Sequence, residues 1–368
     1  MPKATRKIVV ALSGGVDSSV AALLLKQQGH ELIGVSMQVW DYRNHGGCST
    51  RATCCAPSDF MDARKVAAVL DVPYYVFDFE SSFREKVIDK FVRSYQQGYT
   101  PNPCVECNNK VKFGELRARA HTLGFEQVAT GHYARVEGEA GRKRLLRGID
   151  GNKDQSYFLY GTKAAELGAT IFPVGALTKP EVRELAKAAG LVTAEKAESQ
   201  DICFVSGSAG EFVARIGGRR PAGQITDKSG QVLGHHDGIH NFTIGQRRGI
   251  GIGGNEEPIY VVDIDAASNQ VIVGPKEELE REGFRVAETN WINPELLETL
   301  AKDGAAELSA IAQVRHRHAG VPVTLKIDQN GACSARFVSE WSTISPGQAA
   351  VFYDTANIEV LGGGTIVR

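Results

Sequence analysis

A short apolar segment near the N-terminus runs directly into a polar turn that contains two adjacent glycines. Residues 8–12 (Ile-Val-Val-Ala-Leu) are predicted to form a strand, and residues 13–18 (Ser-Gly-Gly-Val-Asp-Ser) lead from it into a helix. Adjacent glycines let the backbone adopt positive φ and approach an anion, while the amides at the start of the helix point at its oxygens. The sequence therefore predicts a phosphate-binding loop, formed by Ala11, Leu12, Ser13, Gly14, Gly15, Val16, Asp17 and Ser18.

Asp17 adds a carboxylate to this loop. A carboxylate beside a polyphosphate is unfavourable unless a cation lies between them, so Asp17 is expected to bind the Mg²⁺ of ATP, directly or through water. The turn lacks the lysine of a Walker loop and the spacing of a dinucleotide fingerprint. It resembles the PP-loop of the N-type ATP pyrophosphatases, which implies cleavage of ATP between its α and β phosphates and transfer of AMP to a carbonyl oxygen. An ordinary glycine turn is the simpler alternative.

Two cysteines lie at Cys-x-x-Cys spacing in a second segment. Residues 100–108 (Thr-Pro-Asn-Pro-Cys-Val-Glu-Cys-Asn) contain Cys104 and Cys107, and a third candidate, Cys203, follows later in Ile-Cys-Phe. The spacing alone fits half of a structural zinc site, a dithiol redox motif or inert thiols. A dithiol motif opens a helix after a strand, without the flanking prolines found here. The other nearby cysteines have the wrong spacing for a zinc ribbon and are expected to be structural or incidental: Cys48, Cys54 and Cys55.

The composition limits the class of protein. The chain has 368 residues, enough for two or three domains, and a formal net charge of −1. We see no apolar run long enough to span a bilayer and no signal-peptide core, so we expect a cytoplasmic protein without a membrane partner. Seven cysteines, an odd number, suggest thiol chemistry or metal ligation in a reducing compartment. A polyanion such as RNA would have to bind local basic clusters.

The first third of the chain alternates apolar strands with helical patterns. Strands are predicted at residues 8–12, 31–39, 74–79 and 126–130, and helices at residues 18–28, 58–70 and 83–97. This order predicts a parallel α/β sheet covered on both faces, with ligands at the carboxyl ends of the strands. Two more residues fall at such ends. Met37 is expected to pack against an adenine ring, and Gly131 to let the backbone approach the nucleotide; an ordinary core side chain and an ordinary turn are the alternatives.

The composition of the sequence changes after about residue 215, where a Gly-Gly-Arg-Arg-Pro-Ala-Gly segment typical of turns is followed by short segments with many glycines. We therefore predict a catalytic α/β domain over residues 1–215, a small central β-rich domain over 216–280 and a β-barrel over 281–368. Short, evenly spaced strands favour the barrel and are expected at residues 312–315, 321–327, 335–338 and 349–353.

Several segments spread over the whole chain carry a resemblance to one family. They are residues 13–18, 101–103, 107–108, 129–133, 152–159, 202–204, 245–249 and 346–353. In this order they resemble the bacterial tRNA-specific 2-thiouridylase family. The resemblance implies a Rossmann-like PP-loop domain and ATP-dependent 2-thiolation of the wobble uridine in tRNAs for Lys, Glu and Gln, through adenylation of the C2 carbonyl oxygen.

The resemblance also implies a route for the sulfur. Cys203 would carry it as a persulfide, and Cys107 would be the nucleophile that releases it, by disulfide formation or as sulfide. Thiolates perform both steps. A cysteine desulfurase or a sulfur-relay protein would donate the sulfur.

Cys104 departs from this family's pattern, because many members have Asp at this position in a base or positioning role. A thiol cannot be assumed to replace that carboxylate. With Cys104, Cys107 and Cys203 together, the site could instead hold a [4Fe-4S] cluster whose fourth iron carries the sulfide. A third cysteine has no evident use in a two-thiol relay and favours the cluster. The persulfide and cluster routes nevertheless use the same residues, and the sequence does not decide between them.

Basic clusters offer local contacts to RNA in this nearly neutral chain. They are residues 142–144, Lys153, residues 247–248 and residues 315–318, and each is also compatible with a solvated surface. The resemblance implies tRNA contacts from Lys153, Asp154, Gln155, Arg315 and His316. Because an anticodon base must leave its stack to be adenylated, the flipped uracil is expected in the loop that contains Asn102.

Two other classes of protein share some of these features. Another AMP transferase of the PP-loop class, such as an amidating synthetase, would need an ammonia source and would leave Cys107 and Cys203 unused. An iron–sulfur or zinc RNA-binding protein with a vestigial nucleotide site would not need Ser13, Asp17 and Ser18 intact. Pyrophosphate release from ATP only in the presence of tRNA discriminates between these classes.

Overall fold

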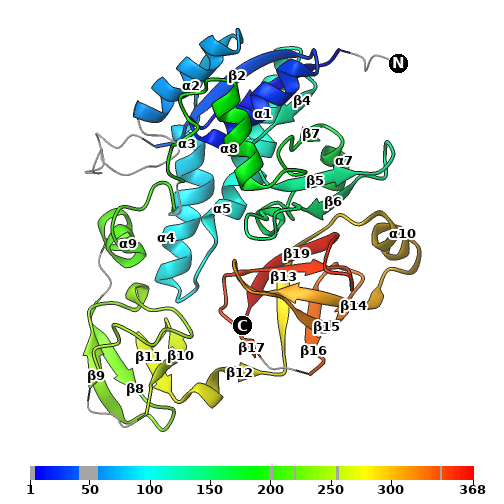
Figure 1. Cartoon of the computed structure of the whole chain (residues 1–368). Helices are drawn as coiled ribbons and strands as arrows, with labels where there is room; N and C mark the ends of the chain where they lie inside the picture. Colours follow the sequence, from blue (N-terminus) through cyan, green and yellow to red (C-terminus); the bar gives the residue numbers. More distant parts are fainter. Residues whose placement is uncertain (1–4, 41–56, 199–201, 219–220, 254–256, 340–341) are drawn as a thin grey trace.

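The chain folds into three units that follow one another along the sequence (Figure 1). The computed structural model describes residues 5–40, 57–198, 202–218, 221–253, 257–339 and 342–368. An α/β unit comes first, a small β-rich module follows, and a closed β-barrel comes last. Among the helices in these ranges, none is long and apolar enough to cross a membrane. The fold class predicted from the sequence is therefore confirmed.

A five-stranded parallel sheet organises the first unit. Its strands lie in the order β3 (Tyr74–Asp78), β2 (Glu31–Gln38), β1 (Lys7–Ala11), β4 (Gln127–Ala129) and β7 (Thr170–Ile171). Successive residues of β1 are buried on opposite faces, because Ile8 and Val10 belong to one apolar cluster and Val9 to another. A strand buried on both faces needs a continuous apolar run, and the sequence after Lys7 supplies it.

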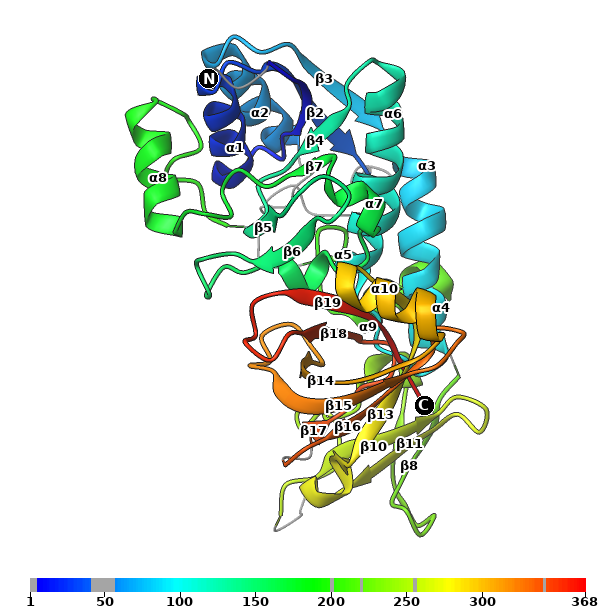
Figure 2. The same cartoon turned by 90° about the vertical axis from the view of Figure 1, so that its right-hand side faces the viewer.

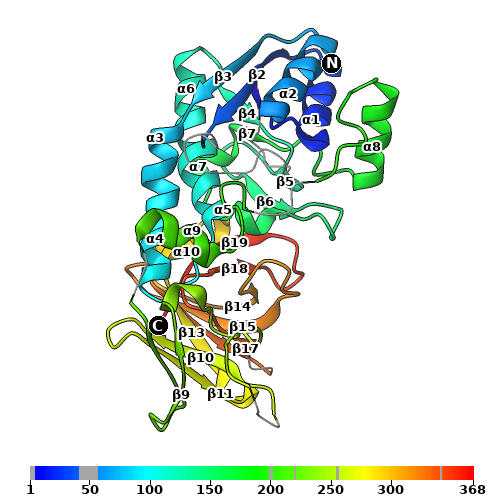
Figure 3. The same cartoon turned by 90° about the vertical axis from the view of Figure 1, so that its left-hand side faces the viewer.

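Helices cover both faces of this sheet. α1 (Val16–Gln27), α2 (Pro57–Val69) and α8 (Lys179–Ala188) pack on the face of Ile8 and Val10. Two long helical runs cover the other face, and Figure 3 shows the first of them extending from the sheet toward the other units. The first run comprises α3 (Glu80–Phe83), the π-helical η1 (Arg84–Ile88) and α4 (Asp89–Gln96); the second comprises α5 (Pro103–Glu106), the π-helical η2 (Cys107–Leu116) and α6 (Arg117–Thr122).

The helix predicted over residues 83–97 differs from the first of these runs in two ways. The run begins earlier, at Glu80, and residues 84–88 are π-helical. Apolar spacing in a sequence does not distinguish a π-helical turn from an α-helical one, so the prediction could not include it.

A hairpin and short helices connect the sheet to the other units. β5 (Ala134–Glu137) pairs with β6 (Arg144–Arg147), and η3 (Ser156–Phe158) and α7 (Ala164–Leu167) follow. α9 (Ala209–Gly217) crosses the domain boundary predicted at residue 215, and its Phe212 is buried beside Phe91 of α4. By its packing, α9 belongs to the α/β unit.

The central module is a four-stranded sheet in the order β10 (Tyr260–Asp265), β11 (Gln270–Gly274), β8 (Gly223–Thr226) and β9 (Val232–His236). The short helices η4 (Ile239–Asn241) and η5 (Lys276–Leu279) accompany it. It has its own apolar cluster, with Ile225, Val261 and Val271 fully buried. A short pairing of β12 (Glu280–Arg281) with β17 (Ser342–Thr343) follows.

The barrel strands lie in the order β13 (Gly283–Trp291), β16 (Cys333–Phe337), β15 (Val321–Ile327), β14 (Ala306–Gln313), β18 (Ala349–Tyr353) and β19 (Val360–Val367), and β13 pairs with β19 to close the barrel. Three of the four expected strands correspond to β15, β16 and β18, whereas the strand expected at residues 312–315 overlaps only the end of β14. The sequence does not predict β13, β19 or α10 (Pro294–Asp303). Three consecutive glycines make β19 resemble a turn, yet Gly362 is required, because a Cβ there would lie 2.4 Å from the carbonyl oxygen of Asn290.

The barrel docks on the α/β unit through a polar cluster around Arg147, and Figure 2 shows β18 and β19 on the side of the barrel that faces β6. The Arg147 guanidinium donates to Asp154 Oδ2 at 2.5 Å and to the carbonyl oxygen of Asn357 at 3.0 Å. It also lies over the ring of Tyr353, 3.6 Å from the centroid. The Ser156 and Tyr353 hydroxyls lie 3.1 Å apart. Arg147 therefore joins the two units.

Replacing Arg147 by Lys should destabilise the joined units by about 2–4 kcal/mol, because an ammonium cannot make the planar set of contacts and the Asp154 carboxylate, 5% exposed, loses part of its pairing. The urea midpoint of unfolding measures this change. Arg142→Lys is the control, because its ion pairs with Glu295 and Glu298 lie on the protein surface, so its midpoint shift should be the smaller one. Equal midpoint shifts for the two variants would contradict the assignment.

Candidate active site

The phosphate loop is shaped by close backbone approaches. Gly14 has a φ of +73°, and a Cβ there would lie 2.2 Å from the carbonyl oxygen of Asp59 near the start of α2. Ser18 closes the loop from the helix side, because its Oγ accepts from the backbone N–H of Ser13 and donates to the carbonyl of Gly15, both at 3.1 Å. Contacts within the protein therefore fix the conformation of the loop, in which the amides at the start of α1 are available to an anion.

The carboxyl ends of β2 and β4 flank this loop. Gly131 follows β4, and a Cβ at this position would lie 2.5 Å from the backbone nitrogen of Ser18. Its missing side chain thus makes room for α1 itself. Met37, near the end of β2, packs partly buried against the apolar cluster on the α4 side of the sheet. The roles of Met37 and Gly131 toward a nucleotide stay predictions.

Asp17 is held by two donors that its own sequence neighbourhood does not reveal. The Lys179 ammonium lies 2.7 Å from Oδ1 and 2.9 Å from Oδ2, and the Tyr133 hydroxyl donates to Oδ1 at 2.8 Å. Burial and the neighbouring Asp17 carboxylate raise the pKa of Tyr133, so this hydroxyl remains a donor. The Thr178 and Glu181 capping box that starts α8 is the sequence signal that fixes the position of Lys179.

A second carboxylate extends this network away from the loop. Glu198 Oε1 binds Lys179 at 2.8 Å, and Oε2 binds Lys153 at 2.7 Å. Burial raises the pKa of Glu198, but the hydrogen bonds from Lys153 and Lys179 outweigh this effect and lower the pKa to about 2. Glu198 is therefore an anion near neutral pH, and two ammonium groups share it.

These groups fit a magnesium nucleotide. Proteins bind Mg²⁺ through one or two carboxylates together with substrate phosphates, and Asp17 supplies a carboxylate, 31% exposed, at the loop. The same carboxylate binds the Lys179 cation, so the position stabilises positive charge. A magnesium ion on Asp17 would compete with Lys179 and would release that ammonium beside the phosphates.

The cysteine motif starts the second helical run. Asn102 is the N-cap of α5, and its Oδ1 accepts from the backbone N–H of Cys104 at 3.2 Å. Cys104 is exposed in the first turn, and Cys107 is partly buried at the start of η2. Cys203 packs, also partly buried, against the same apolar cluster as Cys107. The fold thus brings Cys107 and Cys203 to one apolar cluster from distant parts of the chain.

The placement of the three cysteines does not support a metal cluster. Within the ranges given above, no group of three or more His, Cys, Asp or Glu side chains could hold a metal ion. A [4Fe-4S] cluster would need Cys104, Cys107 and Cys203 to converge. The remaining cysteines near the motif lie outside the described residues: Cys48, Cys54 and Cys55.

Asn108 belongs to a segment that carries the family resemblance, but no role in the site was predicted for it from the sequence. It follows Cys107 directly and is 2% exposed. Its Nδ2 donates to the carbonyl oxygen of Phe158 at 3.1 Å, while its Oδ1 has no hydrogen-bond partner in the described residues. A buried hydrogen bond therefore connects the cysteine helix to the loop of residues 152–158.

The residues expected to contact tRNA lie around the junction of the α/β unit and the barrel. Gln155 Oε1 accepts from the backbone N–H of Tyr133 at 3.0 Å, whereas the Asp154 carboxylate is enclosed in the domain interface. The His316 ring lies 4.6 Å from that of Phe158, and burial lowers the pKa of His316, which favours the neutral imidazole. Contacts with tRNA stay predictions for the whole set, Asn102, Lys153, Asp154, Gln155, Arg315 and His316.

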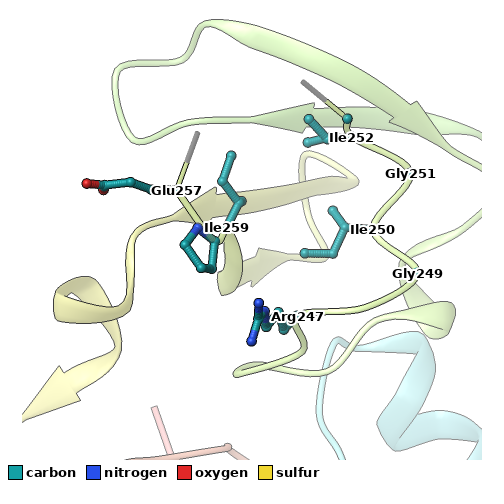
Figure 4. Close-up of a pocket in the computed structure, with 9 residues that line it drawn as sticks. Arg247, Gly249, Ile250, Gly251, Ile252, Glu257 and Ile259 are labelled. Carbon is teal, nitrogen blue, oxygen red and sulfur yellow. The ribbon is translucent and has the colours of Figure 1, made fainter. Parts of the chain in front are cut away.

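The other basic clusters differ in their surroundings. Arg142 and Arg144 both pair with carboxylates, so this cluster ties the β5–β6 hairpin to the last third of the chain. The partners are Glu295, Glu298 and Glu359. Arg247 lies at one end of a pocket of about 290 Å³ in the central module, which isoleucine side chains also line (Figure 4).

The fold and the loop define the class of the protein. A parallel sheet with a Ser-Gly-Gly-x-Asp-Ser loop between β1 and α1 is the arrangement of the HUP, or PP-loop, class of nucleotide-binding domains. Family models match almost the whole chain. They are a tRNA methyl transferase HUP domain over residues 6–207, a tRNA methyl transferase PRC-barrel domain over 210–275 and an aminomethyltransferase β-barrel domain over 281–366.

Curated relatives narrow the class to one family. A protein named tRNA-specific 2-thiouridylase MnmA from Geobacter metallireducens is 48% identical over 99% of this chain and 97% of its own length. Proteins of the same name from Geotalea uraniireducens and Chloroflexus aurantiacus are each 46% identical over 98% of this chain, and over 95% and 98% of their own lengths. The chain belongs to the tRNA-specific 2-thiouridylase family.

Replacing Asp17 by Asn should weaken binding of a magnesium nucleotide at least about tenfold, because the carboxylate that balances the cation is lost. The probe is α,β-methylene-ATP, titrated by calorimetry with Mg²⁺ and, separately, with EDTA. In EDTA the variant should bind no more weakly than the wild type, since Lys179 loses its carboxylate partner. Equal affinities of variant and wild type in Mg²⁺ would show that Asp17 does not lie at the phosphates.

Proposed function

We propose that this chain catalyses ATP-dependent 2-thiolation of the wobble uridine in tRNAs for Lys, Glu and Gln. The observation that carries the proposal is identity of 46–48% over nearly the full length of relatives named as tRNA-specific 2-thiouridylases. The intact phosphate loop and the placement of Cys107 and Cys203 on one apolar cluster support it.

Activation of the base is the first chemical requirement. The C2 carbon of uracil is a poor electrophile with oxide as leaving group, whereas an adenylated oxygen departs as AMP. The C2 oxygen attacks the α-phosphorus of ATP, the bond to the bridging oxygen of the β-phosphate breaks, and pyrophosphate leaves. The loop amides around Ser13 and Ser18 hold the phosphates. Asp17 would hold a Mg²⁺ ion there, and the ion would neutralise part of the phosphate charge.

Sulfur transfer is the second requirement. The terminal sulfur of a Cys203 persulfide attacks C2, and AMP leaves with the former carbonyl oxygen. The Cys107 thiolate then attacks Sγ of Cys203, which breaks the sulfur–sulfur bond, frees the thiolated base and leaves a Cys107–Cys203 disulfide. A thiol reductant returns both cysteines to thiols, and a cysteine desulfurase or sulfur-relay protein loads the next sulfur on Cys203.

The tRNA would lie along the junction of the α/β unit and the barrel. Asn102 faces the base, and the remaining contacts come from Lys153, Gln155, Arg315 and His316. The Asp154 carboxylate, which the domain interface encloses, would hold this segment in place. The reaction takes place in the cytoplasm, where tRNA is available and thiols remain reduced. Methyl transfer, which the descriptions of two family models mention, would leave the phosphate loop and both thiols without a role.

Cys107→Ala and Cys203→Ala should each lower 2-thiouridine formation at least about 100-fold and leave tRNA-dependent pyrophosphate release measurable, because sulfur transfer follows activation. Mass spectrometry of nucleosides and a pyrophosphate assay on the same reactions provide the readout. The control is Cys333→Ala, because Cys333 is 4% exposed in the barrel core, away from the motif. Robust thiolation by either site variant would refute the roles given to these thiols.

Cys104→Asp should retain thiolation in anaerobic reactions, because the persulfide route does not use the Cys104 thiol. Iron content is determined on the same samples. Loss of activity together with loss of bound iron would favour a [4Fe-4S] cluster on Cys104, Cys107 and Cys203 instead, since two protein thiolates hold such a cluster poorly.

A further inference from the structure

A continuous series of charged side chains joins the phosphate loop to the loop of residues 152–158. Lys153 Nζ lies 2.7 Å from Glu198 Oε2, Glu198 Oε1 lies 2.8 Å from Lys179 Nζ, and Lys179 Nζ lies 2.7 Å from Asp17 Oδ1. Charges alternate along this series, so each inner member is shared between two neighbours of opposite sign. A change at one end therefore alters the attraction at the other.

Hydrogen bonds to Asp150 hold the backbone at Lys179 and at Lys153. A bound ligand would therefore act on this series mainly through its side chains. Asp150 Oδ2 accepts from the backbone N–H of Lys179, and its carbonyl accepts from the backbone N–H of Lys153, both at 2.9 Å. Lys179 is 9% exposed, whereas the Lys153 side chain is 33% exposed. Lys153 is thus the ammonium of this series that an RNA phosphate can reach.

We propose that Glu198 is a positioning residue that couples tRNA binding to binding of the magnesium nucleotide; this inference rests on the proposed function. When an RNA phosphate draws Lys153 away, Glu198 has a single cation left and attracts Lys179 more strongly. The pull of Lys179 on Asp17 weakens, and the Asp17 carboxylate becomes available to Mg²⁺. Bound tRNA then tightens nucleotide binding, and by linkage the nucleotide tightens tRNA binding by the same factor.

The direction of the coupling follows from the order of the charges and gives opposite results for two substitutions. Lys153→Met removes the competitor for Glu198, so it imitates the tRNA-bound state and should tighten nucleotide binding when tRNA is absent. Glu198→Gln removes the anion that draws Lys179 away from Asp17, so it should weaken nucleotide binding under the same conditions. A merely structural contribution to folding would not produce opposite signs.

The experiment measures the affinity of the full chain for α,β-methylene-ATP with Mg²⁺, with and without saturating unmodified substrate tRNA. The ratio of the two dissociation constants is the coupling factor. We expect a factor of roughly 5 or more for the wild type and a factor near 1 for both Glu198→Gln and Lys153→Met. Glu195→Gln is the matched control, because Glu195 pairs with Lys187 at 3.1 Å on the protein surface, and its factor should equal that of the wild type.

Two outcomes overturn the inference. One is an unchanged coupling factor in Glu198→Gln, and the other is weaker nucleotide binding by Lys153→Met in the absence of tRNA. The second needs only Lys153→Met, so it applies even where Glu198→Gln fails to fold. Thiouridine formation by the wild type is measured in parallel. If the wild type forms no thiouridine, the proposed function fails. If it forms thiouridine while Glu198→Gln and Lys153→Met keep the coupling factor of the wild type, only the present inference fails.

Discussion

The arrangement of the phosphate loop and the residues beside it depends on the ion pair between Asp17 and Lys179. A partly buried pair is stable only when its remaining donors and acceptors are satisfied. Tyr133 donates to Asp17, and Glu198 accepts from Lys179. These partners come from β1–α1, the segment after β4, α8 and the segment before Cys203, so the pair requires the carboxyl edge of the sheet to be assembled from four distant parts of the chain.

The loop of residues 152–158 connects the carboxyl edge of the sheet to the cysteine helix and to the barrel. Its Lys153 reaches the charged series, the carbonyl of its Phe158 holds Asn108 beside Cys107, and its Ser156 contacts Tyr353 of the barrel. The Tyr157 hydroxyl also donates to the carbonyl of a barrel residue at 2.9 Å. One short segment thus contacts the charged series that leads to the phosphate loop, the cysteine helix and the barrel.

The sequence predicts those features that depend on local patterns. Continuous apolar runs that alternate with segments of helical periodicity predict the parallel sheet, and the pair of adjacent glycines predicts the phosphate loop. Both signals can be recognised because each lies within a few consecutive residues. The sequence did not predict Lys179 as a partner of Asp17, because the two residues are 162 positions apart and no local pattern indicates their ion pair. The sequence did not predict β19 because its three glycines are required by tertiary packing. A Cβ at any of them would lie within 2.6 Å of a backbone carbonyl oxygen of a neighbouring strand, a demand that overrides strand propensity.

The two halves of the proposed chemistry occupy different physical environments, and the sheet accounts for this difference. Side chains with alternating charges surround the phosphate loop, where the negative charge of a polyphosphate must be balanced. The thiols pack instead against the aromatic cluster that contains Phe204 on the other side of the sheet, where Phe83 and Phe91 meet its ring edge to face. The sheet separates the two environments, because successive residues of each strand face opposite layers. Under the proposed function, activation of the base and transfer of the sulfur therefore take place in two environments that one sheet holds together.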